Sequence, residues 1–372
     1  MIARKSIPVA CPILGGNEKK YVLECLDSGW ISSIGRFIGL FEESFARFCG
    51  AGHAISCNNG TSALHLALEA LGTSPGDEII VPTLTYVATA NAVRYCGAQP
   101  VFVDSDACTM ALDPRSLEAA ITKRTKGIIA VHLYGHPADM NQILEIARKH
   151  GLFVMEDAAE AHGALYQGRA VGSLAQAATF SFYGNKIIST GEGGMVTTSD
   201  AAVRDRLRLL RGQGMDPERR YWFPMIGYNY RMTNIAAAIG LAQLEQVNDF
   251  LQQRRLIASI YARELGNLRD HIQLPIEQPW AKHAFWSYPI VLLDTVSLSR
   301  DDMLKALEQD GIETRPVFYP MHTMPPYREA NGKYPIAERL GSRGLCLPMH
   351  CLLTEEDVCY IAQRVEHWCK PR

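Results

Sequence analysis

Lys186 is the residue of this sequence with the clearest capacity for covalent chemistry. It stands in TFSFYGNKIISTGEGGM (179–195), in a predicted turn after an apolar strand, and the seven positions before it hold no acidic residue. A lysine in a partly dry pocket has a lowered pKa and can form a Schiff base with an aldehyde. Ser181, five residues earlier, is placed to face the same pocket. Most lysines are solvated surface charges, so this segment alone leaves both interpretations open.

Asp157 is a second candidate, because it ends the apolar strand in VMEDAAEAHGA (154–164). A carboxylate at such a place is unfavourable unless it meets a cation or several hydrogen-bond donors. A protonated pyridine nitrogen would be a suitable partner. The alternative is a helix cap, since small residues and Glu160 follow, and residue type alone favours that alternative.

A third segment, NNGTSALHLAL (58–68), places Gly60, Thr61 and Ser62 directly before a helical pattern. Free amides and hydroxyls at the start of a helix form an anion site. Threonine and serine cap most helices without any ligand. A phosphate site is therefore one of two interpretations here.

The fourth segment, IGYNYRMTNIAAAIGLAQL (226–244), carries Asn229 and Arg231 before a long helix. Thr233 is the expected cap of that helix. A capping loop explains these residues without a ligand.

The four segments lie at the ends of predicted strands or in turns. Short apolar runs predict strands at 53–57, 78–82, 100–104, 127–132, 152–157 and 178–182, with helical patterns between them. Strands that are apolar on both faces and separated by helices predict an α/β fold with a central, mostly parallel sheet covered on both sides. Ligand sites in such sheets lie at the carboxyl edge of the strands.

The pattern changes after Asn234, where a helical stretch (234–266) is long enough to bridge two domains. A strand-like segment, a helix and a proline-rich segment follow. We therefore expect a large α/β domain over 1–245 and a smaller C-terminal α+β domain over 246–372.

Composition is that of an ordinary globular protein: 372 residues, 47% hydrophobic and 20% charged, with a formal net charge of −2. No run of Lys or Arg indicates nucleic acid or an anionic membrane, and no stretch is long enough to cross a bilayer. The ten cysteines form no Cys-x-x-Cys pair, which favours buried thiols over a metal site or disulfides. These features predict a cytoplasmic protein without a bound metal.

Taken together, in this order and spacing, the four segments resemble the DegT/DnrJ/EryC1/StrS family of aminotransferases that use pyridoxal 5'-phosphate (PLP) to act on sugars. The resemblance covers essentially the whole chain. It includes WISSIGRFIGLFEESFA, PGDEIIVPTLTYVATANAV, VHLYGHPADM, EDAAEAHGA, FSFYGNKIISTGEGGM, GYNYRMTNIAAAIGLAQL and RPVFYPMHTMPPY. It implies a fold-type I, aspartate aminotransferase-like fold and a homodimer in which two subunits build each active site.

The resemblance also implies roles for single residues. Lys186 would bind PLP covalently, and Asp157 would pair with the pyridinium nitrogen. Tyr86 would stack on the ring, and Ala159 would lie near the opposite face. The implied phosphate contacts are Gly60, Thr61, Ser62, Ser181 and, from the partner subunit, Asn229. Many relatives carry His or Gln at position 160, so the role of Glu160 beside the cofactor stays open.

The intact Lys186 indicates amino transfer, because relatives that dehydrate sugars carry histidine there. The resemblance implies cycling between PLP and its amine form (PMP), with glutamate as donor and a nucleotide-linked 4-keto-6-deoxy sugar as acceptor. GDP is the favoured nucleotide, UDP and dTDP stay open, and a non-catalytic PLP-binding regulatory protein is the alternative of another class. Candidate substrate contacts, for which a structural role is an equal alternative, are Trp30, Ser32, Ser33, Arg36, Arg219, Arg220, Tyr221, Arg315, Tyr319 and His322.

Overall fold

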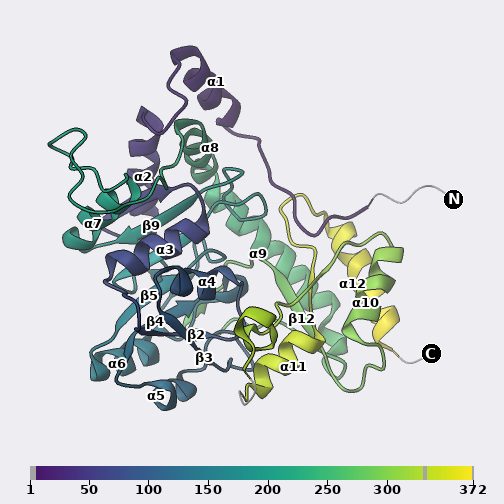
Figure 1. Cartoon of the computed structure of the whole chain (residues 1–372). Helices are drawn as coiled ribbons and strands as arrows, with labels where there is room; N and C mark the ends of the chain where they lie inside the picture. The colour runs from purple at the N-terminus through teal and green to yellow at the C-terminus, as the bar shows by residue number, and fades with distance from the viewer. Residues whose placement is uncertain (1–5, 330–332, 371–372) are drawn as a thin grey trace.

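A seven-stranded sheet forms the centre of the N-terminal two thirds of the chain in the computed structural model, which describes residues 6–329 and 333–370 (Figure 1). The strand order is β1-β9-β8-β5-β4-β2-β3. The strands are β1 (His53–Cys57), β2 (Glu78–Pro82), β3 (Gln99–Val103), β4 (Thr125–Val131), β5 (Phe153–Asp157), β8 (Ala177–Ser181) and β9 (Gly194–Thr198). Only β9 runs against its neighbours, β8 and β1. The expected mostly parallel α/β sheet is therefore confirmed.

Six of these strands lie within two residues of the predicted ones at either end. Strand β9 was missed, because its sequence, GMVTT, follows the glycine-rich turn TGEGG, which is typical of a loop. Gly194 in β9 accommodates a close approach of the backbone, since a Cβ there would lie 2.3 Å from the carbonyl oxygen of Asn59.

Helices cover both faces of the sheet. Alternate residues of β4 enter different cores: Ile128 and Ala130 pack into one, and Ile129 and Val131 into the other. The first face is covered by α2 (Arg36–Cys49), α6 (Met140–His150) and α8 (Asn234–Glu245), and the second by α3 (Gly60–Ala70), α4 (Ala88–Tyr95) and α7 (Ala201–Arg211). Burial on both faces explains why these strands are continuous apolar runs.

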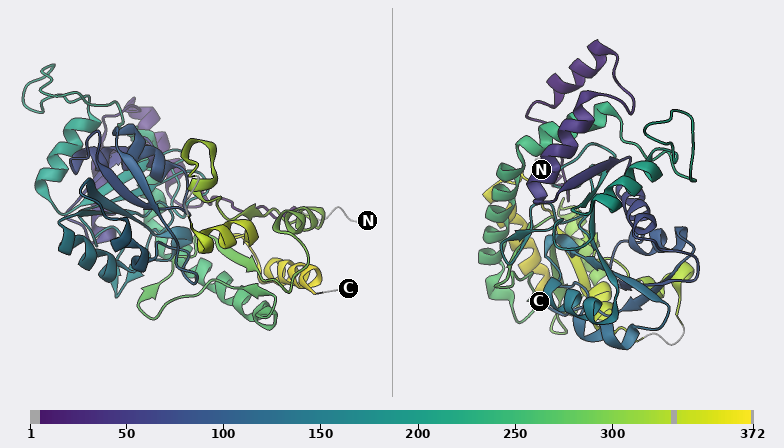
Figure 2. Two further views of the ribbon diagram at one scale, coloured as in Figure 1. Left: turned by 60° about the horizontal axis from the view of Figure 1, so that its bottom comes forward. Right: turned by 90° about the vertical axis from the view of Figure 1, so that its left-hand side faces the viewer.

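A second, antiparallel sheet of four strands follows in the C-terminal third, in the order β10-β12-β14-β13. Figure 2 shows this unit beside the larger one. Its strands are β10 (Ile272–Gln273), β12 (Tyr288–Leu292), β13 (Arg315–Pro316) and β14 (Gly344–Leu347), and its helices are α9 (Val247–Glu264), α10 (Arg300–Gln309), α11 (Pro335–Arg343) and α12 (Glu355–Cys369). Ile7, near the N-terminus, pairs with Ile312 of this unit. The division near residue 245 stays a prediction, and residues 1–5 and 371–372 of the two ranges lie outside the described residues.

The single long helix expected from Asn234 onward is wrong. The structure has two helices, α8 and α9, with Gln246 between them at φ −106° and ψ 0°. The side-chain amide of Gln246 donates hydrogen bonds to the Glu18 carboxylate and to the carbonyl oxygen of Ala242. A continuous helical pattern does not reveal such a break, because the residues on both sides keep their helical spacing. The predicted cap is confirmed: the Thr233 hydroxyl accepts a hydrogen bond from the amide of Ala236.

The remaining elements are short. They are α1 (Glu18–Ser28), α5 (Leu117–Ala120), β6 (Leu165–Tyr166), β7 (Arg169–Ala170), β11 (Ala281–Lys282) and the 3-10 turns Pro114–Ser116, Leu133–Gly135, Gly266–Leu268, Met321–Thr323 and Pro325–Tyr327. All ten cysteines are free thiols. Among the described residues, no helix combines the length and apolar character that a bilayer span requires.

Strand β5 ends in two carboxylates on opposite faces of the sheet, Glu156 and Asp157. Glu156 is fully buried and lies 3.1 Å from His132 Nε2. Its oxygens accept hydrogen bonds of 2.8–3.1 Å from the backbone amides of Gly172, Leu174 and Ala175. These bonds fasten the loop before β8 to β5, so Glu156 holds the strand that presents Asp157.

We expect Glu156→Ala to lower the free energy of unfolding by about 3 kcal/mol, because it leaves several buried amides without an acceptor. Denaturant unfolding of the full chain measures this. The matched control is Glu145→Ala on the exposed face of α6, which is expected to change stability by less than about 0.5 kcal/mol. Equal stability of the two variants would contradict this role of Glu156.

Candidate active site

A cavity of about 520 Å³ lies at the carboxyl edge of the parallel strands, where the seven-stranded sheet faces the C-terminal unit. Asp157 and Ser181 reach it from the last positions of β5 and β8. Arg315 and Cys346 line it from β13 and β14. This is the edge at which parallel sheets place their ligand sites.

Lys186 is the cation at the centre of this cavity. The turn after β8 positions it, with the Lys186 amide donating to the carbonyl oxygen of Tyr183 at 2.9 Å. Its Nζ lies 3.5 Å from Glu160 Oε1 and 4.0 Å from the centre of the Trp286 ring. Burial lowers the pKa of Lys186, and the carboxylates of Glu160 and Asp157 oppose that shift. The side chain is thus not the solvated surface charge of the alternative interpretation.

Asp157 lies in the same cavity and is held by two donors. The Thr89 hydroxyl donates to Asp157 Oδ2 at 2.7 Å, and the amide of Ala159 donates to Oδ1 at 3.2 Å. Burial raises the pKa of Asp157, and these hydrogen bonds act against it. The residues after Asp157 form turns and no helix, so the helix-cap alternative is wrong.

Glu160 is the second carboxylate of the cavity. Its Oε2 accepts a hydrogen bond of 2.8 Å from the amide of Tyr134, which leaves Oε1 directed at Lys186. Burial raises the pKa of Glu160, while the charge of Lys186 lowers it. The side chain whose role the sequence left open is therefore an ion-pair partner of Lys186.

The start of α3 forms one end of the cavity. Gly60 and Thr61 line it, while the Asn59 side chain caps the helix by accepting from the amide of Ser62 at 2.8 Å. A Cβ on Gly60 would lie 2.7 Å from the Cβ of Ser181, so only glycine lets these two segments meet. A helix start beside the hydroxyls of Thr61 and Ser181 is suited to a phosphate.

Aromatic side chains also line the cavity. The rings of Tyr134 and Phe318 stack at 5.4 Å, and Tyr86 packs against Phe318 at 5.7 Å. Trp286 donates from Nε1 to the carbonyl oxygen of Asn185, which fixes the turn that carries Lys186. The buried Arg254 of α9 in turn donates to the carbonyl oxygen of Trp286 at 3.0 Å.

Sequence reasoning assigned no site role to Thr89, Tyr134, Asn185, Glu192 or Trp286, all of which line the cavity. Trp286 comes from a segment 100 residues after Lys186, and only the three-dimensional packing brings it there.

The predicted site residues fall into two groups. Those that line the cavity are Gly60, Thr61, Tyr86, Asp157, Ala159, Glu160, Ser181, Lys186 and Arg315. Those outside its described lining are Trp30, Ser32, Ser33, Arg36, Ser62, Arg219, Arg220, Tyr221, Asn229, Tyr319 and His322. Tyr319 instead accepts from Arg300, and His322 lies between Thr83 and Glu338. Substrate contacts for these residues stay predictions.

Asn229 pairs with Gly212 at the base of the segment between α7 and α8, and Figure 1 shows this segment as a projecting loop. Its Oδ1 accepts from Arg231 Nε at 2.9 Å, and its side chain is exposed. The loop also exposes apolar side chains, with Ile226 88% exposed and Trp222 51% exposed. Apolar groups gathered on such a loop are typical of a contact surface.

Comparison with known proteins identifies relatives over the full length of the chain. The model of the DegT/DnrJ/EryC1/StrS aminotransferase family matches residues 12–366. A GDP-perosamine synthase of Caulobacter vibrioides is 58% identical over 353 residues, which cover 95% of each chain. A GDP-perosamine synthase of Escherichia coli O157:H7 is 51% identical, over 98% of this chain and 99% of its own. Helicobacter pylori PseC, an aminotransferase involved in the biosynthesis of pseudoaminic acid, superimposes with a TM-score of 0.92 at 30% identity, over 98% and 99% of the two chains.

Aminotransferases of this kind use PLP, and the residues of the cavity fit that group. The start of α3 and Ser181 suit its phosphate, Asp157 suits its ring nitrogen, and Lys186 suits its aldehyde. Asn185 adds a buried side-chain oxygen that has no hydrogen-bond partner in the described part of the chain. Such an atom is expected where a polar ligand completes the site.

We expect Thr89→Val to weaken PLP binding about 10-fold, because hydrogen bonds to charged groups contribute about 1.5–3 kcal/mol. The variant keeps the shape of the side chain but leaves Asp157 with one donor fewer. Retention of the cofactor during dialysis, followed by its absorbance, measures the effect. Thr85→Val is the matched control, since Thr85 bonds to Thr89 and not to Asp157. Equal retention by both variants would contradict this role of Thr89.

We expect Glu160→Gln to shift the pH dependence of PLP uptake toward lower pH. The carboxylate of Glu160 raises the pKa of Lys186, so its removal lowers that pKa and leaves more neutral, reactive amine at a given pH. The rate of PLP uptake by cofactor-free enzyme across a pH series measures the shift. Glu192→Gln, on the exposed side of the same cavity, is the control. A midpoint that stays in place or rises in Glu160→Gln would refute the ion-pair role.

Proposed function

The chain belongs to the DegT/DnrJ/EryC1/StrS aminotransferase family, and from this premise we propose that it aminates GDP-4-keto-6-deoxymannose to GDP-perosamine. The relatives described as GDP-perosamine synthases span nearly its whole length, which supports this acceptor over other keto sugars. The product is an aminosugar for surface polysaccharide such as an O-antigen. Glutamate is the proposed amino donor.

One observation carries the proposal: a buried lysine of lowered pKa faces two carboxylates beside the start of a helix. When bound there, PLP supplies an aldehyde that bonds to amines and a ring that withdraws electrons. A PLP-binding sensor would need the phosphate site and the lysine, but it would not need a carboxylate that keeps the ring nitrogen protonated. The presence of Asp157 beside Lys186 therefore supports turnover.

Each of these residues has a defined part in the proposed reaction. Asp157 keeps a proton on the pyridine nitrogen, because a nearby negative charge favours the cationic form. The amides at the start of α3 and the hydroxyl of Ser181 hold the phosphate. Lys186 Nζ removes a proton from the carbon that bears the donor amino group and later returns a proton to the sugar carbon. Glu160 stabilises the charged form of Lys186 between these steps.

Arg315 is the arginine that lines the cavity within the described part of the chain. Its side chain is half exposed, and it lies 3.5 Å from Glu313. A guanidinium fork there suits the carboxylate of the donor or a phosphate of the nucleotide sugar. We assign it to substrate binding on that ground.

The proposal includes a homodimer with shared active sites. Asn229 lies outside the cavity of its own chain, on a loop that exposes Tyr221, Trp222, Phe223 and Ile226. Burial of these side chains against a second copy would remove apolar surface from water and bring Asn229 to the partner's phosphate site. Two copies per particle by light scattering are expected.

The acceptor is tested with GDP-, UDP- and dTDP-linked 4-keto-6-deoxy sugars, glutamate and purified enzyme. We expect aminosugar at an appreciable rate only from the GDP-linked compound, because the three compounds share the diphosphate and differ in the base, and a site that hydrogen-bonds one base leaves polar groups unpaired with another. Lys186→Ala is expected to abolish turnover and the absorbance of covalently bound cofactor while it retains the fold by circular dichroism. Turnover by Lys186→Ala, or a preference for a UDP- or dTDP-linked sugar, would overturn the corresponding part of the proposal.

A further inference from the structure

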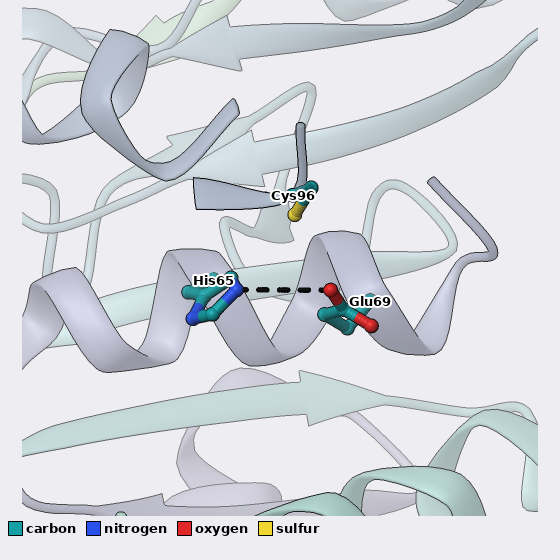
Figure 3. A group of neighbouring side chains, drawn as sticks. All are labelled: His65, Glu69 and Cys96. Carbon is teal, nitrogen blue, oxygen red and sulfur yellow. Dashed lines mark ion pairs between the residues drawn. The ribbon is translucent and has the colours of Figure 1, made fainter. Parts of the chain in front are cut away.

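Three potential metal ligands converge on the face of α3 that is turned toward the end of α4, outside the active-site cavity. His65 and Glu69 are four residues apart on α3, and Cys96 directly follows α4. Figure 3 shows the three side chains directed at one another. Their ligand atoms all lie within 4.8 Å of one another, and His65 Nε2 is 3.7 Å from Glu69 Oε1.

The environment of the His65 side chain indicates a ligand. His65 is 4% exposed, and its buried Nε2 has no hydrogen-bond partner among the residues that the structure describes. The other nitrogen, Nδ1, lies 3.3 Å from the hydroxyl of Tyr230. If Nδ1 carries the proton and donates to Tyr230, Nε2 presents a lone pair toward Glu69 and Cys96. Metal-binding histidines are oriented in this way, by a hydrogen bond from the nitrogen that does not bind.

We propose that His65 Nε2, the Glu69 carboxylate and Cys96 Sγ bind one Zn²⁺ ion. Zinc binds His nitrogen, Cys sulfur and carboxylate oxygen at about 2.0–2.3 Å, which sets tetrahedral ligand atoms about 3.3–3.6 Å apart. The His65–Glu69 separation is close to this value. Rotation of the Glu69 and Cys96 side chains brings the widest pair closer by about 1 Å, within the reach of ordinary rotamers.

The chemistry of the set favours zinc over calcium or magnesium, which prefer oxygen ligands. Cys96 is 5% exposed, and burial raises the pKa of its thiol to about 12. Binding therefore exchanges the thiol proton, which leaves to solvent, for a sulfur–zinc bond. Glu69 has a side chain that is 24% exposed, so water can reach the fourth position.

The surroundings of the cluster are aromatic. The rings of Tyr95, Tyr228 and Tyr230 lie 4.8–6.0 Å from the His65 ring. Among the described residues, no Lys or Arg forms an ion pair with Glu69. A bound ion would link α3 to the end of α4. This link lies about one helical turn along α3 from Gly60 and Thr61, which line the cofactor cavity.

The test uses the full-length, PLP-loaded enzyme after dialysis against a chelator, with Zn²⁺ alone and Co²⁺ alone as probes. We expect one Zn²⁺ per chain by elemental analysis and equilibrium dialysis. Co²⁺ is expected to give the visible bands of a tetrahedral site with a thiolate ligand. Cys96→Ser and His65→Gln are expected to weaken Zn²⁺ binding on the order of 100-fold, and Tyr230→Phe about 10-fold.

Cys369→Ser is the matched control, because Cys369 is an equally buried thiol elsewhere in the fold. It is expected to leave Zn²⁺ binding unchanged. Glu69→Gln is a further test variant. Its side chain is partly exposed, so the substitution is expected to leave helix α3 intact. The proposal would be overturned if the wild-type enzyme binds no Zn²⁺ or if the Co²⁺ spectrum shows no thiolate ligand. Zn²⁺ binding that is unchanged in Cys96→Ser and Glu69→Gln would also overturn it. These outcomes decide the question even if His65→Gln does not fold.

Discussion

The active site depends on a balance between burial and charge around one lysine. Burial lowers the pKa of Lys186 and raises the pKa of Asp157 and of Glu160, so in a dry cavity each group alone would become neutral. The attraction between Lys186 and each carboxylate opposes these shifts, whereas the charge of Asp157 adds to the rise in the pKa of Glu160. The pKa of the amine is thus lowered by burial and raised by its two carboxylate neighbours. Displacing any one of these groups from the cavity would change the pKa of the other two. The protonation of the site therefore depends on the contacts that hold the three side chains in place.

The sheet supplies that fixation. Strands β5 and β8 are parallel neighbours, so their carboxyl ends present Asp157 and the Lys186 turn at one edge. The alternation of side chains along β5 places Glu156 on the other face of the sheet. There its carboxylate accepts hydrogen bonds from three backbone amides, and these bonds fix the end of the strand. The C-terminal unit contributes Trp286 against Lys186, and Arg254 secures that segment. The reactive groups are thus held from two units, although both carboxylates and the amine come from one.

Features that depend on residues close together in the sequence could be predicted, and features that depend on contacts between distant segments could not. Strand positions were predictable because burial on both faces leaves a continuous apolar run, as in β4 and β5. Asp157 and Lys186 were candidates because the first ends such a run and the second lies in the turn after one, but their roles followed only from the resemblance of the four segments to the family. Strand β9 was not, since its start is glycine-rich and its pairing with β1 joins segments far apart in the chain. The break at Gln246 likewise depends on Glu18, and the place of Trp286 depends on packing across two units.

The charges at the cavity also indicate where substrate selection resides. Its described lining holds two cationic side chains, Lys186 and Arg315, and the first is already matched by Glu160. A nucleotide sugar brings a diphosphate and a donor amino acid brings carboxylates, whereas the guanidinium of Arg315 already lies 3.5 Å from Glu313. The positive charge in the cavity is therefore too small to neutralise either substrate. Arg219 and Arg220 stand on the projecting loop, outside the lining of their own chain, and stack on Trp222 and Tyr221. We therefore infer that groups that distinguish one nucleotide from another lie on the partner surface of the proposed dimer, while the cavity itself carries the chemistry common to keto-sugar substrates.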